Sequence, residues 1–303
     1  MKHLLTIEQL NATEIDEILA LSHTLKATRC KFSKDLPLAG QTWGLIFTKA
    51  STRTRVSFEV GIRELGGSPL YLSGNDIQLG RGETVADTAR VLSRYLHGVI
   101  IRTFAQQDVE EFAQCGTIPV INALTDNEHP CQILADLFTI QEKLGALKGK
   151  RITFVGDGDC NVARSWIFAA AKMDMPLTIA APHGYQPPPA LLARAGGDIR
   201  VTDDIHAAAK DADVLYTDVW VSMGKESESL DRLRVLAPYQ LNSEIAALAK
   251  PNALVMHCLP AYRGKEISAE LLDANQQTIF DQAENRLHAQ KGILTVLVRA
   301  HRS

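Results

Sequence analysis

The fold of this chain is decided by the stretch Trp43-Gly-Leu-Ile-Phe47-Thr-Lys-Ala-Ser51-Thr-Arg-Thr-Arg55. Its first five residues form an apolar run that is typical of a buried parallel strand. From Val56 onward the apolar residues recur at helical spacing, which predicts a helix with Ser51 at its N-cap. A strand that leads within a few residues into a helix is the repeating unit of parallel α/β sheets, so this stretch predicts that class of fold.

The start of this predicted helix carries side chains that suit a phosphate dianion. Free backbone N–H groups and the positive end of the helix dipole meet the hydroxyls of Ser51, Thr52 and Thr54 and the guanidinium of Arg53. Each residue also has an ordinary explanation. Hydroxyls are common helix caps, and Arg55 stands four residues before Glu59, the spacing of a surface ion pair. Because so many of these residues follow one buried strand, the pattern favours phosphate binding.

The length and composition limit the classes of protein to consider. The chain has 303 residues, which predicts two domains, and its 46% apolar and 22% charged residues indicate a globular enzyme. A formal net charge of −3 gives no basis for nucleic-acid binding. No apolar run approaches the roughly 20 residues of a membrane-spanning helix, and the N-terminus leads directly into a helical pattern. We therefore expect a cytoplasmic protein with no membrane partner.

The cysteines indicate free thiols rather than disulfides or a zinc site. There are five cysteines, and no two form a CxxC pair. An odd number without metal-ligand spacing is typical of a protein in a reducing compartment. Three of them lie inside candidate motifs, and each by itself is most simply a small buried apolar residue. These are Cys131, Cys160 and Cys258.

Strand and helix patterns alternate along the rest of the chain. In the first half they predict strands at 98–102 and 118–121 and a helix at 130–144. Glycines and lysines interrupt the apolar periodicity at 144–150, and a second alternating series begins at Ile152. The last helix is predicted at about 284–300.

The sequence therefore predicts an α/β protein with two doubly wound parallel-sheet domains. The first domain is expected to comprise residues 1–146, with a C-terminal helix at about 286–303 returning to it. Residues 147–285 are expected to form the second domain. In this arrangement both terminal helices pack on the first domain.

Polar residues follow several predicted strands, where open parallel sheets bind their ligands. Arg102 ends one strand, and the next leads to His129-Pro-Cys-Gln132 at the start of a helix. In the second half, strands lead into Asp218-Val-Trp-Val-Ser-Met-Gly224 and His257-Cys-Leu-Pro260. Taken singly, a histidine in a loop is usually a cap or solvated, and Asp218 could equally be a helix cap. Their shared position at strand ends favours binding or catalysis.

The turn Gly156-Asp-Gly158 resembles a dinucleotide-binding turn only weakly. The third glycine of the GxGxxG pattern is absent, because Asn161 occupies its position. A nicotinamide cofactor is therefore not expected.

Several of these motifs together resemble the aspartate and ornithine carbamoyltransferase family. Ser51-Thr-Arg-Thr-Arg55 is similar to the carbamoyl phosphate signature of that family, and His129-Pro-Cys-Gln132 to the ornithine branch's second signature. The segments beginning at Asp218 and His257 resemble the ornithine members specifically. The mobile loop of the family matches Gln78-Leu-Gly-Arg-Gly-Glu83, and Arg286 matches a contact in the final helix. Ala50, Asp159 and Cys160 depart from the family pattern, which spans nearly the whole chain.

The resemblance implies a set of site residues. The carbamoyl phosphate ligands would be Ser51, Thr52, Arg53, Thr54, Arg55, Gln78, Arg102, His129, Gln132, Cys258, Leu259 and Arg286. The ornithine ligands would be Asn161, Asp218, Ser222 and Met223. Catalysis would depend on Arg102, His129, Asp218 and Cys258, without a metal or an organic cofactor. In the trimers of this family, Gln78 reaches the site of a neighbouring subunit, so a homotrimer is expected.

The implied reaction is transfer of a carbamoyl group from carbamoyl phosphate to the δ-amine of L-ornithine, giving L-citrulline and phosphate, as in arginine biosynthesis. Asp218 and Cys258 agree with this substrate, because an anion and a thiol suit the cationic groups of a diamino acid. One alternative is another amine substrate, such as putrescine or an acylated ornithine. A second is a catalytically silent anion-binding module on the same fold.

Overall fold

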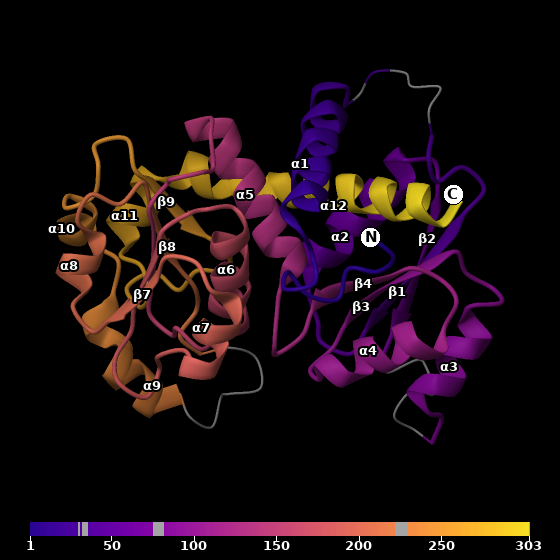
Figure 1. Ribbon diagram of the computed structural model, residues 1–303, viewed down its shortest axis with the longest axis horizontal. Coiled ribbons are helices and arrows are strands. Elements are labelled where there is room, and N and C mark those ends of the chain that lie inside the picture. The colour runs from indigo at the N-terminus through magenta and orange to yellow at the C-terminus, as the bar shows by residue number, and fades with distance from the viewer. Residues whose placement is uncertain (30, 32–35, 75–81, 222–228, 303) are drawn as a thin grey trace. The chain divides into compact units, whose positions relative to one another are not determined.

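The computed structural model describes residues 1–29, 31, 36–74, 82–221 and 229–302. It divides into two compact units (Figure 1). Unit 1 comprises Met1–Phe138 and Asn285–Ser303, and unit 2 comprises Thr139–Glu284. Each unit is built on its own parallel sheet, as the alternation of strand and helix patterns predicted.

The sheet of unit 1 has four parallel strands in the order β2-β1-β3-β4. β3 and β4 are buried along their whole length, which explains their unbroken apolar runs. The prediction for β4 was wrong at both ends, because the strand runs from Val120 to Leu124 rather than from 118 to 121. Pro119 has no N–H to donate to the ladder, and its carbonyl instead accepts from Val99 at 2.9 Å. The strands are β1 (Thr42–Phe47), β2 (Ser68–Ser73), β3 (Gly98–Arg102) and β4 (Val120–Leu124).

The helices of unit 1 include both ends of the chain. α12 packs closely on α1, as shown at Gly292, where a Cβ would lie 2.7 Å from the Ile18 carbonyl oxygen. A Cβ on Gly61 of α2 would lie 3.3 Å from the Lys291 side chain. Packing of the terminal helices on this unit is therefore confirmed. Its helices are α1 (Ala12–Ala27), α2 (Thr52–Glu64), α3 (Val85–Leu92), α4 (Gln106–Cys115), and the parts of α5 (Pro130–Leu144) and α12 (Gln276–Arg302) that belong to it.

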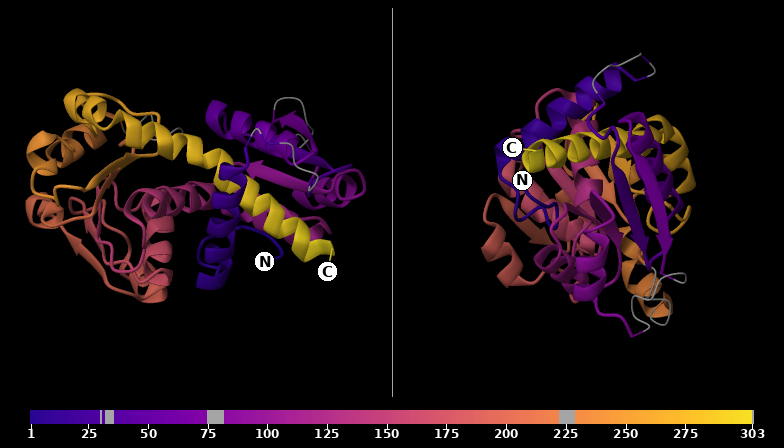
Figure 2. Two further views of the ribbon diagram at one scale, coloured as in Figure 1. Left: turned by 90° about the horizontal axis from the view of Figure 1, so that it is seen from above. Right: turned by 90° about the vertical axis from the view of Figure 1, so that its right-hand side faces the viewer.

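The sheet of unit 2 has five parallel strands in the order β7-β6-β5-β8-β9, with helices on both of its faces (Figure 2). Its core joins strand residues such as Val155 and Leu215 to Ile279 of α12. The strands are β5 (Ile152–Val155), β6 (Leu177–Ala180), β7 (Ile199–Thr202), β8 (Val214–Thr217) and β9 (Leu254–His257). The helices are α6 (Asn161–Lys172), α7 (Pro189–Ala195), α8 (Ile205–Ala209), α9 (Ser229–Leu236), α10 (Ser243–Ala246) and α11 (Ala269–Ala274).

The last helix is longer than predicted, since it begins at Gln276 rather than near 284. No proline or glycine interrupts residues 276–290, so nothing in that stretch ends a helix. The short helices α9 and α11 were not predicted, because segments of 8 and 6 residues are too short to show a clear helical period.

Each sheet has one point where the strand order reverses. In unit 1 the chain passes from β1 to β2 and then returns to β3 on the other side of β1. In unit 2 it passes from β5 to β6 and β7 and then returns to β8. Crevices at the carboxyl ends of such strand pairs are where open α/β sheets bind ligands. The fold therefore points to the residues after β1 and β3 and to those after β5 and β8.

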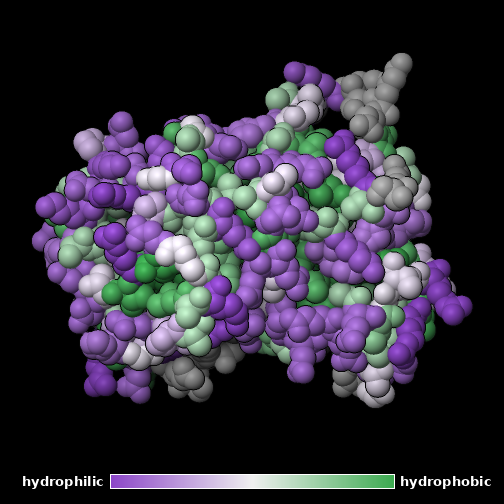
Figure 3. Space-filling view, viewed as in Figure 1, coloured by the Kyte–Doolittle hydropathy of each residue, from purple (hydrophilic) through white to green (hydrophobic). Residues whose placement is uncertain are grey.

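Polar residues cover most of the face shown in Figure 3, with smaller apolar areas between them. Within the described ranges, none of the helices offers a stretch long and apolar enough to cross a membrane.

Candidate active site

The start of α2 in unit 1 has the capped geometry that the sequence predicted. Ser51 is the N-cap, and its hydroxyl accepts a hydrogen bond from the Thr54 N–H at 3.2 Å. Thr52 and Arg53 are exposed in the first turn, while Thr54 is buried. The helix start therefore presents N–H groups, hydroxyls and a guanidinium after β1.

Arg286 joins three helices of unit 1 at this point. Its Nη1 donates to Gln132 Oε1 at 2.7 Å, and its Nη2 donates to Thr54 Oγ1 at 3.3 Å. Gln132 is held in turn because its Nε2 donates to Asp136 Oδ1 at 2.9 Å. Thr54, Gln132 and Arg286 are all buried. Three predicted ligands from α2, α5 and α12 are thus brought together.

Arg102 lies at the end of β3, beside the loop that follows β1. Its Nε donates to the Lys49 carbonyl oxygen at 3.2 Å, and its own carbonyl accepts from the Thr48 N–H at 3.0 Å. Lys49 is a further buried cation here. Its Nζ lies 2.9 Å from Asp126 Oδ1 and 4.8 Å from the centre of the Phe104 ring. The loop after β1 is therefore fixed to β3 by both backbone and side-chain bonds.

His129 is buried directly before the first residue of α5. Burial lowers its pKa well below the usual range, and the charges of Arg286, Arg102 and Lys49 lower it further. The effect of these three cations on one imidazole shows that the surroundings of His129 are positive. A neutral histidine can donate a hydrogen bond there without adding another positive charge.

Arg55 differs from the other residues of its motif. Its Nε lies 2.8 Å from Glu59 Oε1, and its guanidinium stacks 3.6 Å from the centre of the Tyr71 ring. These contacts match the surface ion pair that the spacing of Arg55 and Glu59 allowed as an alternative. A role for Arg55 in phosphate binding stays a prediction.

In unit 2, Asp218 and Cys258 meet at the ends of β8 and β9. The Cys258 thiol donates to Asp218 Oδ1 at 2.9 Å, and the Val219 N–H donates to the same oxygen at 2.7 Å. Burial raises the pKa of Asp218 above its ordinary value, while His257, the Cys258 thiol and the Val219 N–H act in the opposite direction. The result is a desolvated carboxylate beside a partly exposed thiol.

The backbone around Cys258 is held by a buried histidine. His257 Nδ1 accepts from the Leu259 N–H at 2.9 Å, so its proton is on Nε2, which lies 3.2 Å from Glu266 Oε1. The same Glu266 oxygen accepts from the Tyr262 N–H. Leu259 has a φ of 56°, a conformation that costs a non-glycine residue energy. The His257–Glu266 pair holds Leu259 in that conformation next to Cys258.

Arg232 ties together the two loops at the strand reversal of unit 2. Its Nε donates to the Trp220 carbonyl oxygen at 2.7 Å, its Nη2 pairs with Asp157, and its guanidinium lies 4.9 Å from the centre of the Tyr185 ring. Trp220 follows Asp218, and Asp157 precedes Asn161, the first residue of α6. Gly156 has a φ of 121°, and a Cβ there would lie 3.2 Å from Trp220 Nε1, so only glycine fits this turn.

The motif cysteines have different surroundings. The Cys131 thiol donates to the Asn122 carbonyl at 3.3 Å, and burial raises its pKa to about 12. Burial also raises the pKa of Cys160 well above its usual value, with Asp218 and Asp157 adding to the effect. Both are therefore protonated side chains in the interior, and Cys258 is the motif thiol that can reach a ligand.

Asp218, His257 and Cys258 also offer potential metal-ligand atoms that lie within 4.8 Å of one another. A metal ion there would have to replace the bond from Cys258 to Asp218 and one of the His257 bonds. The donor atoms are thus already used in a hydrogen-bond network, and metal-free chemistry stays the prediction.

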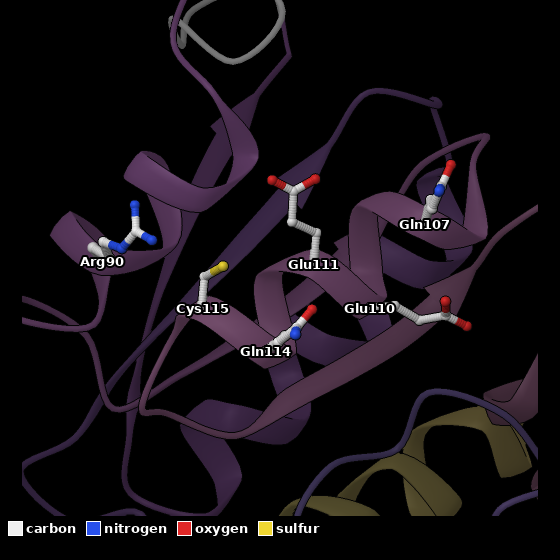
Figure 4. Close-up of a pocket in the computed structure, with 6 residues that line it drawn as sticks. All are labelled: Arg90, Gln107, Glu110, Glu111, Gln114 and Cys115. Carbon is white, nitrogen blue, oxygen red and sulfur yellow. The ribbon is translucent and has the colours of Figure 1, made fainter.

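A separate hollow in unit 1 contains none of the predicted site residues. It lies between α3 and α4, with Arg90 on the first helix and the others on the second (Figure 4). The residues that line it are Arg90, Gln107, Glu110, Glu111, Gln114 and Cys115.

Two family models match this chain in succession. The aspartate/ornithine carbamoyltransferase carbamoyl-P binding domain matches residues 2–142, and the Asp/Orn binding domain of the same family matches residues 148–297. The chain belongs to the aspartate/ornithine carbamoyltransferase family. The resemblance predicted from the motifs is confirmed over nearly the full length.

Among its relatives in this carbamoyltransferase family, the ornithine carbamoyltransferase of Akkermansia muciniphila is 54% identical over the whole of both chains. That of Syntrophus aciditrophicus is 52% identical, covering 98% of this chain and 99% of the relative. The solved ornithine carbamoyltransferase from Pyrococcus furiosus is 45% identical with a TM-score of 0.92, covering 98% of this chain and 97% of that one. The anabolic enzyme from Campylobacter jejuni is 37% identical with a TM-score of 0.93, covering 99% and 100%.

Three residues that the family resemblance implies, Gln78, Ser222 and Met223, lie outside the described residues. Sequence reasoning did not identify Lys49, Arg232 or Glu266 as parts of the site. A lysine two residues after a buried strand was a usable signal for Lys49. Arg232 and Glu266 had none, because an arginine on a short helix and a glutamate in a loop are ordinarily exposed.

Proposed function

We propose that this chain transfers the carbamoyl group of carbamoyl phosphate to the δ-amine of L-ornithine, giving L-citrulline and phosphate. The observation that carries the proposal is the contact between Asp218 and Cys258 at the ends of β8 and β9 in unit 2. A buried carboxylate there attracts a cationic amino acid, whereas a dicarboxylic amine such as aspartate calls for a cation instead. The relatives named above, which are ornithine carbamoyltransferases, support the same substrate.

On the carbamoyl phosphate side, the site of unit 1 neutralises a dianion. Ser51, Thr52, Arg53 and Thr54 offer donors around the start of α2, and Arg286 adds a second guanidinium beside Thr54. Phosphate is already a good leaving group. These residues therefore need mainly to bind it and to stabilise its charge as the C–O bond breaks.

The reaction needs a proton to leave before the new bond forms. The δ-ammonium of ornithine has a lysine-like pKa of about 10.4 and is almost wholly protonated at neutral pH. After one proton is lost, the amine nitrogen attacks the carbamoyl carbon, and the tetrahedral intermediate expels phosphate as it collapses. A second proton leaves that nitrogen, so the products are citrulline, hydrogen phosphate and one released proton. Asp218 and Cys258 are the groups we propose to orient the amine and bias its proton loss.

The second proposed role of unit 1 is to stabilise the oxyanion that develops on the carbamoyl group. Thr54, Arg102 and His129 are the proposed donors to it, and all three are buried. His129 acts as a neutral donor because its pKa is lowered. The remaining ligand roles stay predictions: Arg55, Gln78, Gln132, Cys258 and Leu259 toward carbamoyl phosphate, and Asn161, Ser222 and Met223 toward ornithine.

The direct test is citrulline formation by purified protein from carbamoyl phosphate and L-ornithine. L-aspartate, putrescine and N-acetylornithine are compared at equal concentration, and the Asp218→Asn variant controls for a contaminating enzyme. We expect product with ornithine alone and a large loss in the variant. A faster reaction with putrescine or N-acetylornithine, or no reaction with any amine, would contradict the proposal.

We further propose that the working form is a cytoplasmic homotrimer that serves arginine biosynthesis, with a first domain of 1–146 and 286–303 and a second of 147–285. The support is the family membership and the match of Gln78 to a residue that crosses between subunits.

If Arg102→Ala and Gln78→Ala are each inactive, mixed trimers should regain activity at sites where one chain supplies Arg102 and its neighbour supplies Gln78. A monomer by sedimentation, or verified hybrids without activity, would contradict shared sites.

A further inference from the structure

The first residues of the chain lie along the edge of the unit 1 sheet, beside β4. The Leu4 N–H donates to the Val120 carbonyl at 2.9 Å, and the Asn122 N–H donates to the Leu4 carbonyl at 2.7 Å. Leu4 forms a parallel bridge with Ile121, and both Leu4 and Ile7 are fully buried. The N-terminal segment 3–7 is therefore an ordered addition to the sheet.

β4 leads into a tight turn that ends at His129. The Thr125 N–H donates to the Glu128 carbonyl at 3.0 Å, and the Glu128 N–H donates to Thr125 Oγ1 at 3.2 Å. The His129 carbonyl then accepts from the Gln132 N–H at 3.0 Å as α5 begins. The position of His129 thus depends on how the turn 125–128 is held.

Glu128 connects this turn to the N-terminal segment. Its Oε2 accepts from the Ile7 N–H at 2.8 Å, and the residue is only 4% exposed. A buried carboxylate is costly unless it is hydrogen-bonded, and a bond to a charged acceptor is stronger than a neutral one. The bond joins Ile7 and Glu128, which are far apart in the chain, and Glu128 stands directly before His129.

We propose that Glu128 is a positioning residue for His129, and that it acts by clamping the turn 125–128 to the N-terminal segment. Thr125 and Asn122 support the same connection, since Asn122 Nδ2 donates to the Leu5 carbonyl at 2.8 Å. The catalytic consequence rests on the proposed function, in which His129 stabilises the oxyanion. The hydrogen bonds that form the clamp do not depend on the proposed function.

The first experiment compares Glu128→Leu, which removes the acceptor, with Glu128→Gln, which keeps one at nearly the same place. Misplacing a catalytic donor is expected to lower kcat by roughly ten- to a hundredfold in Glu128→Leu. The KM for ornithine should stay unchanged, Glu128→Gln should recover most of the activity, and Glu17→Leu, an exposed change in α1, should match wild type. Wild-type kcat in Glu128→Leu, or an equal rise of both KM values, would overturn the proposal.

The second experiment needs neither turnover nor a ligand. The ring signals of His129, assigned by comparison with His129→Gln, are measured by NMR in wild type and in the two Glu128 variants. They should shift in Glu128→Leu and stay in place in Glu128→Gln, whereas identical spectra in all three would refute the clamp. If wild type forms no citrulline, the proposed function fails while this measurement still decides the position of His129.

A third measurement covers the case in which Glu128→Leu does not fold. In wild-type protein His129 is also a proposed ligand of carbamoyl phosphate, so a clamp that positions it should favour carbamoyl phosphate binding. By reciprocity, bound carbamoyl phosphate should stabilise the clamp. Hydrogen exchange at the Ile7 amide should therefore slow when carbamoyl phosphate is added, while exchange at the Val109 amide of α4 serves as the reference. Unchanged exchange at Ile7 in the bound protein would overturn the proposal.

Discussion

The candidate sites of the two units occupy equivalent places in their sheets but carry opposite charge. Each lies where the strand order reverses, between β1 and β3 in unit 1 and between β5 and β8 in unit 2. The buried charged groups described above include the cations Lys49, Arg102 and Arg286 in the first. In the second they include the acids Asp157, Asp218 and Glu266 beside one arginine, Arg232. The same backbone arrangement thus provides a place for a ligand, and the residues after the strands determine which ligand it is.

The pKa shifts express this difference. The cations of unit 1 add to the effect of burial and keep His129 neutral. In unit 2, burial raises the pKa of Asp218, and hydrogen bonds from Cys258 and Val219 partly counter it. An anionic ligand would stabilise the first set of groups, and a cationic ligand the second.

The largest effect is expected from removing the charge of unit 2. Asp218→Asn keeps the size of the side chain and an oxygen acceptor, but it loses the anion that we propose to attract ornithine. Losing a buried charge contact costs about 4 kcal/mol, which is roughly a thousandfold in kcat/KM for ornithine. Steady-state kinetics measure this loss, and phosphate affinity should remain that of wild type.

The same substitution should increase stability. Because the pKa of Asp218 is raised in the folded protein, its stabilising contribution is complete below the unfolded pKa and is lost as pH rises through the folded value. At neutral pH the charged form therefore destabilises unit 2, and Asp218→Asn should raise the Tm. The exposed Asp198→Asn controls for a general effect of charge. Full activity in Asp218→Asn, or a lower Tm, would show that Asp218 does not play this role.

A smaller effect is expected from removing one cation of unit 1. Arg53 is exposed in the first turn of α2, and Arg53→Ala should cost about a hundredfold in kcat/KM for carbamoyl phosphate. Arg55→Ala should cost less, because Arg55 is bonded to Glu59 and stacked on Tyr71. Kinetics with varied carbamoyl phosphate separate the two variants. Equal losses would mean that both arginines of the motif bind the phosphate.

Most of the fold was predictable because its signals are local. Buried parallel strands give unbroken apolar runs, as at Gly98–Arg102, and Ser51 marks the start of α2. The errors lie where tertiary contacts decide: the register of β4 is set by pairing with β3, and the first turns of α12 have no clear apolar period.

The motif residues could be recognised in the sequence, and their roles stay predictions. The groups that hold them in place could not be recognised. Asp218 and His129 belong to compact motifs, but the partner of a motif residue can lie anywhere in the chain. Arg232 is 75 residues from Asp157, and Glu128 is 121 residues from Ile7. No local pattern joins such pairs, because the fold brings them together.

Arg232 allows a test of this long-range support in unit 2. Arg232→Lys keeps the charge but cannot bond Trp220 and Asp157 in the same geometry, since lysine lacks the planar fork. We expect the KM for ornithine to rise about tenfold as the loops near Asp218 and Asn161 loosen, with the KM for carbamoyl phosphate unchanged. Arg234→Lys, an exposed change on the same helix, is the matched control. If only the KM for carbamoyl phosphate changed, Arg232 would support carbamoyl phosphate binding rather than ornithine binding.

The smallest effect concerns the pH dependence of unit 1. The pKa of His129 is lowered in the folded protein, so the unfolded chain binds a proton there more readily. This contribution to stability is complete above the unfolded pKa of about 6.5 and is lost as pH falls toward the folded value. Between pH 7.5 and 5.5 it should amount to about 1 kcal/mol. Urea unfolding gives the free energy of unfolding of wild type and of His129→Gln at both pH values. The contribution of His129 is the loss of this free energy on acidification in wild type minus the loss in His129→Gln. If both proteins lose the same stability on acidification, His129 is not held neutral by the positive site. The contrast in pKa shifts between the two units would then rest on Asp218 alone.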